Sequence, residues 1–86
     1  MKALVASLLL ALPASAAEQT LRLTIEGWHS KGDAYKTEQA VRAVKGVNGT
    51  SSDVTKKQLT VVYDDAAASP ASIEKAISAA GYLAHR

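Results

Sequence analysis

Two segments of alternating pattern, the first of them strict, are each followed by a segment of helical period, and they constrain the fold of this 86-residue chain more than any other feature. In Thr20–Glu26 apolar residues occupy every second position, and Leu59–Asp64 repeats the pattern. Because successive side chains of a strand point to opposite faces, both segments are predicted to be strands with one buried face and one exposed face.

The residues after the first strand change to helical spacing. Apolar and small side chains recur three and four positions apart from Asp33 or Ala34 to Lys45, so we predict a helix there. Asp33 is its predicted N-cap, because a carboxylate can accept hydrogen bonds from the free backbone N–H groups of the first turn. Gly46 is its predicted end.

A second helix and two weaker strands complete the predicted elements. Ser69–Pro70 predicts a helix start, since a hydroxyl suits the cap and proline suits the first turn, and Gly81 predicts the end. The polar stretch Val47–Thr55 is predicted to be an edge strand that turns at Lys56–Gln58, and Tyr82–His85 a short last strand.

The order strand, helix, strand, strand, helix, strand predicts an α+β fold. It is the order of ferredoxin-like βαββαβ domains, in which two helices cover one face of a four-stranded antiparallel sheet. Right-handed crossovers then fix the spatial order of the strands as fourth, first, third, second.

The first sixteen residues have the features of a secretory signal peptide. Lys2 gives a positive start, residues 3–12 form an apolar run too short to span a bilayer, and Pro13 ends that run. The small residues Ala14–Ala16 suit cleavage after Ala16, with Ala17 as the alternative. We therefore expect a single domain over residues 17–86 that is periplasmic or secreted and free of the membrane after cleavage.

Composition narrows the classes of function. The chain has no cysteine, which excludes disulfides, thiolate metal sites and thiol redox chemistry. One of its ten Lys and Arg residues, Lys2, lies in the predicted leader. The mature chain therefore has nine basic and eight acidic residues, and its net charge is near +1. That balance does not indicate nucleic-acid binding, which calls for a clustered basic face. We expect a monomer.

A set of short motifs resembles one known family. The motifs are Gly27, Glu38-x-Ala40, Gly46-Val47, Val61-x-Tyr63-Asp64, Ile73, Ala76-Ile77 and Gly81-Tyr82. At these spacings they resemble the heavy-metal-associated domains of copper chaperones, metal-ATPase leaders and the periplasmic mercury carrier. The resemblance covers essentially the whole predicted mature chain, and it implies the ferredoxin-like scaffold and a role in metal-ion binding or transport.

The chain departs from this family at the residues that carry the chemistry. The family pattern has Gly-Met-x-Cys-x-x-Cys after the first strand, and here Trp28 replaces the methionine while Ser30 and Asp33 replace the cysteines. Cu(I) and Hg(II) are soft ions that depend on thiolate ligands, so a hydroxyl and a carboxylate are poor substitutes. Binding of the usual cargo is therefore expected to be lost or weak.

Three residues of this loop are candidate metal ligands. His29 and Asp33 are competent ligands for Zn(II), Cu(II) or Ni(II), and the Ser30 hydroxyl is a weaker candidate. Two good ligands are too few for a tight site, so the alternative is an exposed loop histidine beside a helix-capping aspartate. Tyr82 is expected near the loop, whereas His85 is expected about 10 Å down the last strand.

The same end of the fold is also a candidate surface for protein docking. The predicted topology brings Lys56 and Lys57 to the end that carries Lys31, so that the three lysines would suit an acidic periplasmic protein or a metal transporter. Trp28 either packs inward over the first helix or is exposed as a contact residue.

A few other side chains are assigned provisionally by their position. Tyr35 and Tyr63 are predicted to be core or half-buried, and Glu38 and Glu74 are predicted to lie on exposed helical faces. Ser30 beside His29 has no orienting third group, so we do not expect an enzyme.

Overall fold

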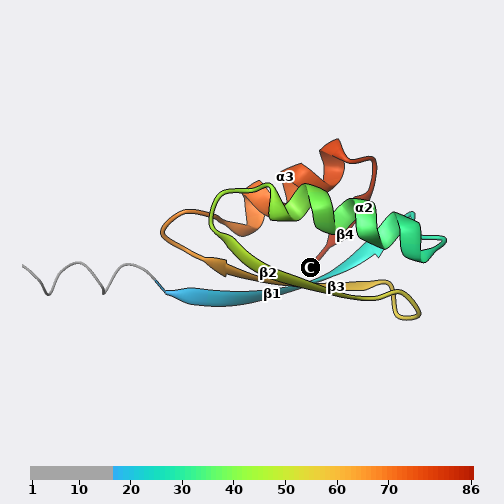
Figure 1. The fold of residues 1–86 in the computed structure, drawn as a ribbon, viewed down its shortest axis with the longest axis horizontal. Coiled ribbons are helices and arrows are strands. Elements are labelled where there is room, and N and C mark those ends of the chain that lie inside the picture. The colour runs from blue at the N-terminus through green and yellow to red at the C-terminus, as the bar shows by residue number, and fades with distance from the viewer. Residues whose placement is uncertain (1–16) are drawn as a thin grey trace, which may run out of the picture.

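The computed structural model describes residues 17–86, and the leader predicted over residues 1–16 lies outside the described residues. The elements are β1 (Glu18–Glu26), α2 (Lys31–Arg42), β2 (Val47–Asp53), β3 (Gln58–Asp64), α3 (Pro70–Ala79) and β4 (Leu83–His85). The strands form one antiparallel sheet in the order β2-β3-β1-β4, and both helices lie on the same face of it (Figure 1). The predicted ferredoxin-like fold and strand order are confirmed.

The core is aliphatic and lies between the sheet and the two helices. β1 and β3 supply their alternate residues, and each helix supplies one apolar stripe; the side chains that are fully buried are Leu23, Ile25, Trp28, Thr37, Val41, Leu59, Val61, Ile73 and Ile77. Burying one aliphatic side chain of this size contributes about 1.5–3 kcal/mol. The alternation seen in the sequence is therefore the pattern that builds this core.

Helix α3 begins as its sequence predicts. Ser69 is the N-cap and accepts a hydrogen bond from the backbone N–H of Ser72, while the Ser72 side chain accepts one from the backbone N–H of Ser69. Pro70 occupies the first turn, where a missing N–H has no consequence. Gly81, with φ +98°, follows the helix as predicted.

Helix α2 begins and ends earlier than predicted. Ser30, not Asp33, is the N-cap, so the prediction that Asp33 caps the helix was wrong. The helix ends at Arg42, and Gly46 belongs to the turn that follows it. With φ +100°, Gly46 lies so near the β3–α3 loop that a Cβ would be 2.8 Å from that of Ala67, which requires glycine there.

The predicted exposure of three helix side chains was wrong, namely that of Tyr35, Glu38 and Glu74. Tyr35 is 62% exposed, because the buried stripe of α2 passes through Ala34 and Thr37 instead. Glu38 was predicted to be exposed, but its side chain is only 16% exposed and accepts hydrogen bonds from Arg42 and from Thr50 of β2.

Of the other two side chains, Glu74 differs from its prediction and Tyr63 agrees with it. Glu74 was predicted to lie on an exposed helical face, but its side chain is only 28% exposed and pairs with the Arg86 guanidinium. Tyr63 is buried on the inner face of β3, as predicted. Within residues 17–86 no helix has the length and apolar character needed to cross a membrane.

Candidate functional site

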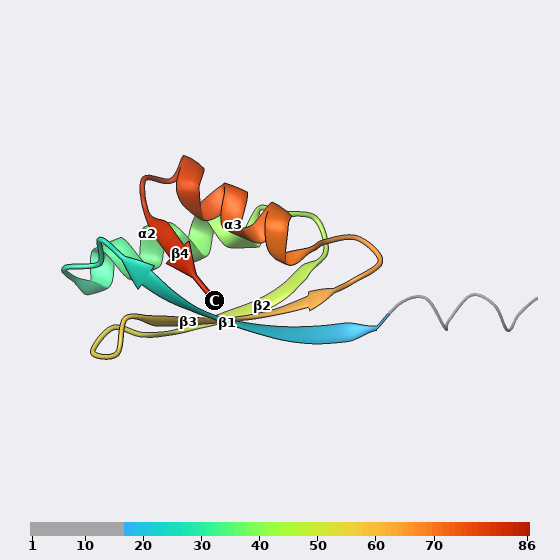
Figure 2. The same cartoon turned by 180° about the vertical axis from the view of Figure 1, so that it is seen from behind.

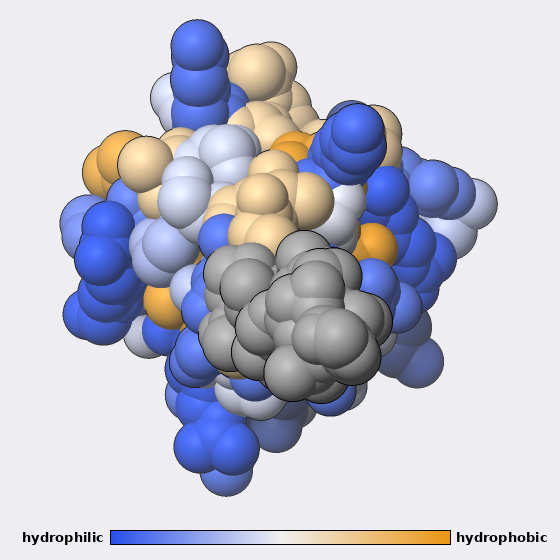
Figure 3. All heavy atoms as spheres, turned by 90° about the vertical axis from the view of Figure 1, so that its left-hand side faces the viewer, coloured by the Kyte–Doolittle hydropathy of each residue, from blue (hydrophilic) through white to orange (hydrophobic). Residues whose placement is uncertain are grey.

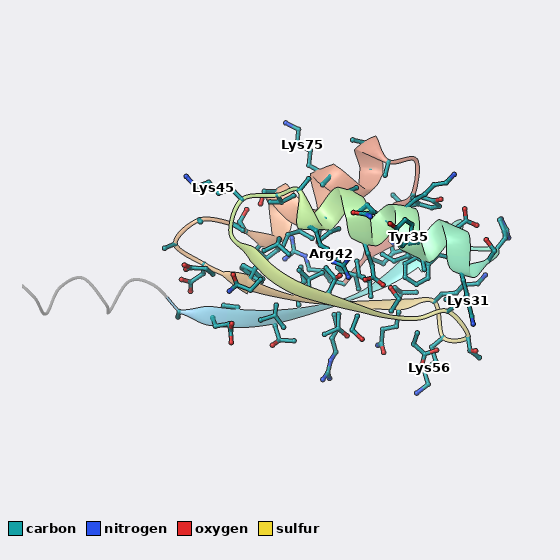
Figure 4. All side chains as sticks on the ribbon, in the orientation of Figure 1. Lys31, Tyr35, Arg42, Lys45, Lys56 and Lys75 are labelled. Atoms are coloured by element: carbon teal, nitrogen blue, oxygen red, sulfur yellow. The ribbon has the colours of Figure 1, made fainter. Side chains whose placement is uncertain are left out.

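The β1–α2 loop and the β2–β3 turn lie together at one end of the domain, which we call the loop pole (residues 27–31 and 54–57). The backbone N–H of Ile25 donates to the carbonyl of Lys57 at 2.8 Å, which fixes the turn beside the end of β1. Lys31 and Lys56 project at this end, whereas Lys45 lies toward the other (Figure 4). The predicted meeting of loop and turn is confirmed.

Trp28 belongs to the core. Its side chain is 1% exposed, and its Nε1 donates to the Thr37 hydroxyl at 2.8 Å. That hydroxyl in turn donates to the backbone carbonyl of Asp33 at 2.9 Å, so the buried polar atoms are satisfied. The hypothesis of an exposed Trp28 contact residue was therefore wrong, and packing over the first helix is confirmed.

The two residues at the family's ligand positions are both engaged in holding the loop. The Ser30 hydroxyl accepts from the backbone N–H of Asp33 at 3.4 Å as the helix cap. One Asp33 oxygen accepts from the backbone N–H of His29 at 2.8 Å, and the other accepts from the Tyr82 hydroxyl at 2.7 Å. Hydroxyl and carboxylate thus stabilise the loop from inside.

Tyr82 reaches the loop from the opposite end of the sequence, just before β4, as the topology predicts. Its ring lies over Gly27, where a Cβ would be 3.1 Å from a ring carbon and where φ is +104°. A glycine at this position lets the ring pack against the backbone and the hydroxyl reach Asp33. The Gly81-Tyr82 motif and the predicted topology indicated this residue from the sequence, but nothing there indicated its bond to Asp33.

These hydrogen bonds shift the ionisation of both partners. The Tyr82 hydroxyl and the His29 N–H lower the pKa of Asp33 below its ordinary value of 3.8, and the positive charge of Lys36 adds to the effect. The same bond raises the pKa of Tyr82 above 10.0, because removing its proton would place two anions together. At neutral pH Asp33 is therefore an ionised acceptor with a neutral tyrosine as donor.

The two histidines have different surroundings. His29 is exposed, and its imidazole forms no hydrogen bond with any residue from 17 to 86. His85 lies opposite Thr24 in the sheet, with its Nε2 2.5 Å from a Glu26 carboxylate oxygen. His85 thus lies down β4 from Tyr82, as predicted, with its ring against Glu26. His29 is the histidine at the loop pole, and its ring forms no hydrogen bond with the described residues.

Three exposed lysines surround the loop, and we call them the lysine rim (Lys31, Lys56 and Lys57). The backbone N–H of Lys56 is held by the Asp53 carboxylate at 3.1 Å, which shapes the turn. Lys57 has φ +56°, in the left-handed region that favours glycine, and is the one non-glycine residue of the described chain with such a backbone. The rim therefore places three positively charged side chains at the end of the domain that carries His29.

Comparison with known proteins places this geometry in a family. The model of the heavy-metal-associated domain matches residues 22–82. The chain belongs to the heavy-metal-associated domain family. Among its relatives, the mercuric transport protein periplasmic component of Acinetobacter calcoaceticus is 36% identical over 85 residues, which is 95% of this chain and 93% of that protein. The corresponding protein of Salmonella typhi is 35% identical over the same shares.

Solved structures agree with this assignment. Oxidized MerP from Ralstonia metallidurans CH34 superposes with a TM-score of 0.77 at 29% identity, over 80% of this chain and 96% of that one. The N-terminal domain of PacS from Synechocystis PCC6803 gives a TM-score of 0.71 at 30% identity, over 78% and 94%. The heavy-metal-associated scaffold is thus preserved throughout the described domain.

The donor atoms of this heavy-metal-associated domain do not form a ready site for a soft ion. The chain has no cysteine, and within residues 17–86 no three His, Asp or Glu side chains come close enough together to hold a metal. Of the three predicted ligands, Ser30 and Asp33 are engaged and only the His29 imidazole is free. The pole can offer one imidazole free of hydrogen bonds to the described residues, and one carboxylate whose two oxygens already accept bonds from the His29 N–H and the Tyr82 hydroxyl.

Proposed function

We propose that the protein is a periplasmic component of a metal-transport system that binds metal ions weakly, through borderline donors at the loop pole. The family and the relatives named as periplasmic components of mercuric transport support this role. The signal-like residues 1–16 support export. The proposed activity is binding and not catalysis.

The absence of thiols determines which ions fit. Hg(II) and Cu(I) obtain their affinity in proteins from sulfur ligands, and this chain has none. A neutral imidazole suits Zn(II), Cu(II) and Ni(II), and a carboxylate can join it. The proposed cargo is therefore a borderline divalent ion, bound with modest affinity because so few ligands are available.

The observation that carries this proposal is the contrast between His29 and its neighbours. His29 is exposed and its ring is free of hydrogen bonds within the described domain, so it can bind an ion without loss of any contact. Asp33 follows four residues later and accepts a bond from the His29 backbone at 2.8 Å, so its carboxylate lies beside the histidine. An ion on His29 could recruit one Asp33 oxygen from Tyr82.

Calorimetric titration with Zn(II), Cu(II), Ni(II) and Cu(I) tests the proposal. We expect micromolar or weaker binding of the divalent ions, lost in His29→Ala and retained in His85→Ala, which removes the other histidine of the described domain. Cu(I) should bind no better to the wild type than to His29→Ala. No heat with any divalent ion, or equal loss in both histidine variants, would contradict a site at His29.

A second candidate function is docking through the lysine rim onto an acidic protein, such as an acidic surface of a metal transporter. The observation in its favour is Lys57, because a non-glycine residue in the left-handed region costs about 1 kcal/mol and such strain concentrates at functional positions. Together with Lys31 and Lys56 it forms an exposed basic surface, which steers acidic partners by long-range attraction. Trp28 has no part in this surface, since it is buried.

Two matched double variants test the docking hypothesis. Lys31→Gln with Lys56→Gln removes two charges from the rim, and Lys45→Gln with Lys75→Gln removes two charges elsewhere (Figure 4). With poly-L-glutamate as a defined acidic probe, the rim variant should bind several-fold more weakly at low salt while the control binds as the wild type does. Equal weakening in both would show attraction by net charge alone and no docking surface.

A further inference from the structure

The sheet has an edge that β4 covers only in part. β4 pairs with β1 at Thr24, Ile25 and Glu26, whereas β1 begins at Glu18. The first half of β1 therefore runs on beyond β4 with no strand of the described chain on that side, as seen from behind the domain (Figure 2). Such an edge is a template for another strand.

The hydrogen-bond register shows which backbone groups face this open edge. Ile25 donates to Lys57 of the β2–β3 turn, and Ala17 accepts from Asp65, so the odd-numbered residues of β1 bond toward β3. In an antiparallel ladder the alternate residues bond to the other side. Thr24 and Glu26 accordingly face β4, and the N–H and C=O groups of Glu18, Thr20 and Arg22 face open solvent.

We propose that this edge pairs with the same edge of a second copy of the chain, antiparallel and centred on Thr20. In that register Thr20 lies opposite Thr20 of the second copy, and Glu18 lies opposite its Arg22. The twofold axis repeats the Glu18–Arg22 pair, so two opposite-charge pairs form. The residues that would exchange backbone hydrogen bonds are all even-numbered, so outward-facing N–H and C=O groups meet on both sides.

The side chains of the open edge are free to make these pairs. Arg22 is exposed and forms no hydrogen bond or ion pair with residues 17–86, and Glu18 accepts only a 3.3 Å bond from Asn48. Opposite charges two positions either side of Thr20 make the strand complementary to itself when it is reversed. This charge complementarity is why we infer a second copy and not an unrelated strand.

The other edge of the sheet does not share this property. β2 has a register shift between Val47 and Gly49, and irregularities of this kind bend an edge and hinder pairing. Its sequence, VNGTSSD, contains no basic residue, so self-pairing would place no cation opposite Asp53. Of the two edges of the described sheet, only that of β1 is therefore complementary to itself.

The expected complex is weak. It would gain about six backbone hydrogen bonds and two exposed ion pairs, each of which contributes little in water. Pairing along half a strand also buries far less surface than a standard protein interface. We expect self-association in the range of about 0.1–1 mM, so the protein is a monomer when dilute.

Charge exchange tests the proposed register. Glu18→Arg places arginines opposite one another in its own dimer and Arg22→Glu places glutamates opposite one another, so each variant alone should self-associate about tenfold more weakly than the wild type. An equimolar mixture of the two places arginine opposite glutamate at both positions and should recover the association. The measurement is sedimentation equilibrium of the exported, purified chain up to millimolar concentration.

A backbone variant tests the edge independently of charge. Thr20→Pro removes an N–H that has no partner in the monomer, so the domain should stay folded while association is lost. Thr20→Val keeps the N–H and should associate as the wild type does, and circular dichroism verifies that both fold. A wild type that stays monomeric at millimolar concentration overturns the inference. So does an association that Thr20→Pro leaves unchanged, or a charge-variant mixture no stronger than its components.

Discussion

The domain contains two strand-to-helix junctions of the same type, and they are stabilised in different ways. Both place a serine at the N-cap, Ser30 before α2 and Ser69 before α3. At the α3 junction all the capping contacts lie between Ser69 and Ser72. At the α2 junction the third helical residue is Asp33, whose carboxylate also binds Tyr82, 49 residues away.

The buried side chains that precede the two caps differ greatly in size. Ala68 fills the space before the α3 cap, whereas the whole indole of Trp28 fills the space before the α2 cap. The α3 junction lies near the other end of the domain, whose surface is mostly hydrophilic around a small weakly hydrophobic area (Figure 3). Helix α3 thus begins with a capping box formed by two residues three positions apart. The loop pole depends in addition on contacts between residues far apart in the sequence, which form only in the folded chain.

Replacing Trp28 should have the largest effect. Trp28→Ala removes a fully buried aromatic side chain and leaves Thr37 without its indole partner, so we expect a loss of about 3–5 kcal/mol in the free energy of unfolding. A domain of this size has about 4–10 kcal/mol in total, so much of the population should unfold. Urea denaturation measures the loss. A loss smaller than that of the cap variants would contradict the claim that buried tertiary contacts stabilise the α2 junction more than its local cap does.

The caps themselves come next. Ser69→Ala removes the hydroxyl that accepts from the Ser72 N–H, while the bond from the Ser69 N–H to the Ser72 side chain remains, and it should cost about 1 kcal/mol. Ser30→Ala should cost about half as much, because its hydroxyl bond is long, at 3.4 Å, and Asp33 still stabilises the helix start by its charge. Urea denaturation of the two variants in parallel sharpens the comparison. A larger loss from Ser30→Ala would show that the α2 junction also depends mainly on its local cap.

Loss of the long-range contact should have a smaller effect on stability and a distinct effect on metal binding. Tyr82→Phe removes the hydroxyl from Asp33 while the ring stays over Gly27, so the melting temperature should fall by a few degrees or less. The released carboxylate oxygen should then raise Zn(II) affinity several-fold by calorimetry. Tyr82→Phe combined with Asp33→Asn is the control, and equal affinity in the two variants would exclude Asp33 as a ligand.

The smallest effect should be a pH dependence that only the α2 junction has. The pKa of Asp33 is lowered in the fold, so its contribution is present above its ordinary value of 3.8 and is lost as pH falls through the folded pKa. The pKa of Tyr82 is raised, so its contribution is present below 10.0 and is lost as pH rises through the folded pKa.

Melting temperatures of the wild type and Asp33→Asn across the pH range measure this dependence. The difference in melting temperature between the two proteins should be constant near neutral pH. It should become smaller in acid, as Asp33 is protonated, and smaller again at high pH, as Tyr82 loses its proton. Ser69→Ala should show no such profile relative to the wild type, because Ser69 and Ser72 do not titrate. A constant difference for Asp33→Asn across the acid range would contradict the assigned bond.

Much of the fold could be predicted from local patterns, and the site only in part. The alternation in β1 and β3, and the Ser69–Pro70 start of α3, were sufficient because they reflect backbone periods and caps that act over a few residues. The start of α2 was misplaced because Ser30 and Asp33 are both good caps, and the choice depends on where the loop leaves β1. Tyr35 and Glu38 were misjudged because a helix period does not fix which stripe faces the sheet when small residues occupy several faces.

By itself the sequence determined the order of the elements, the aliphatic core and the lack of any thiol, since each of these depends on residue type and spacing along the chain. Only the tertiary structure decided that Trp28 lies inside, that Tyr82 binds Asp33, and that half of β1 is an open edge. These features join or separate residues far apart in sequence. Their free energies depend on distances and burial that exist only after the sheet and helices have packed.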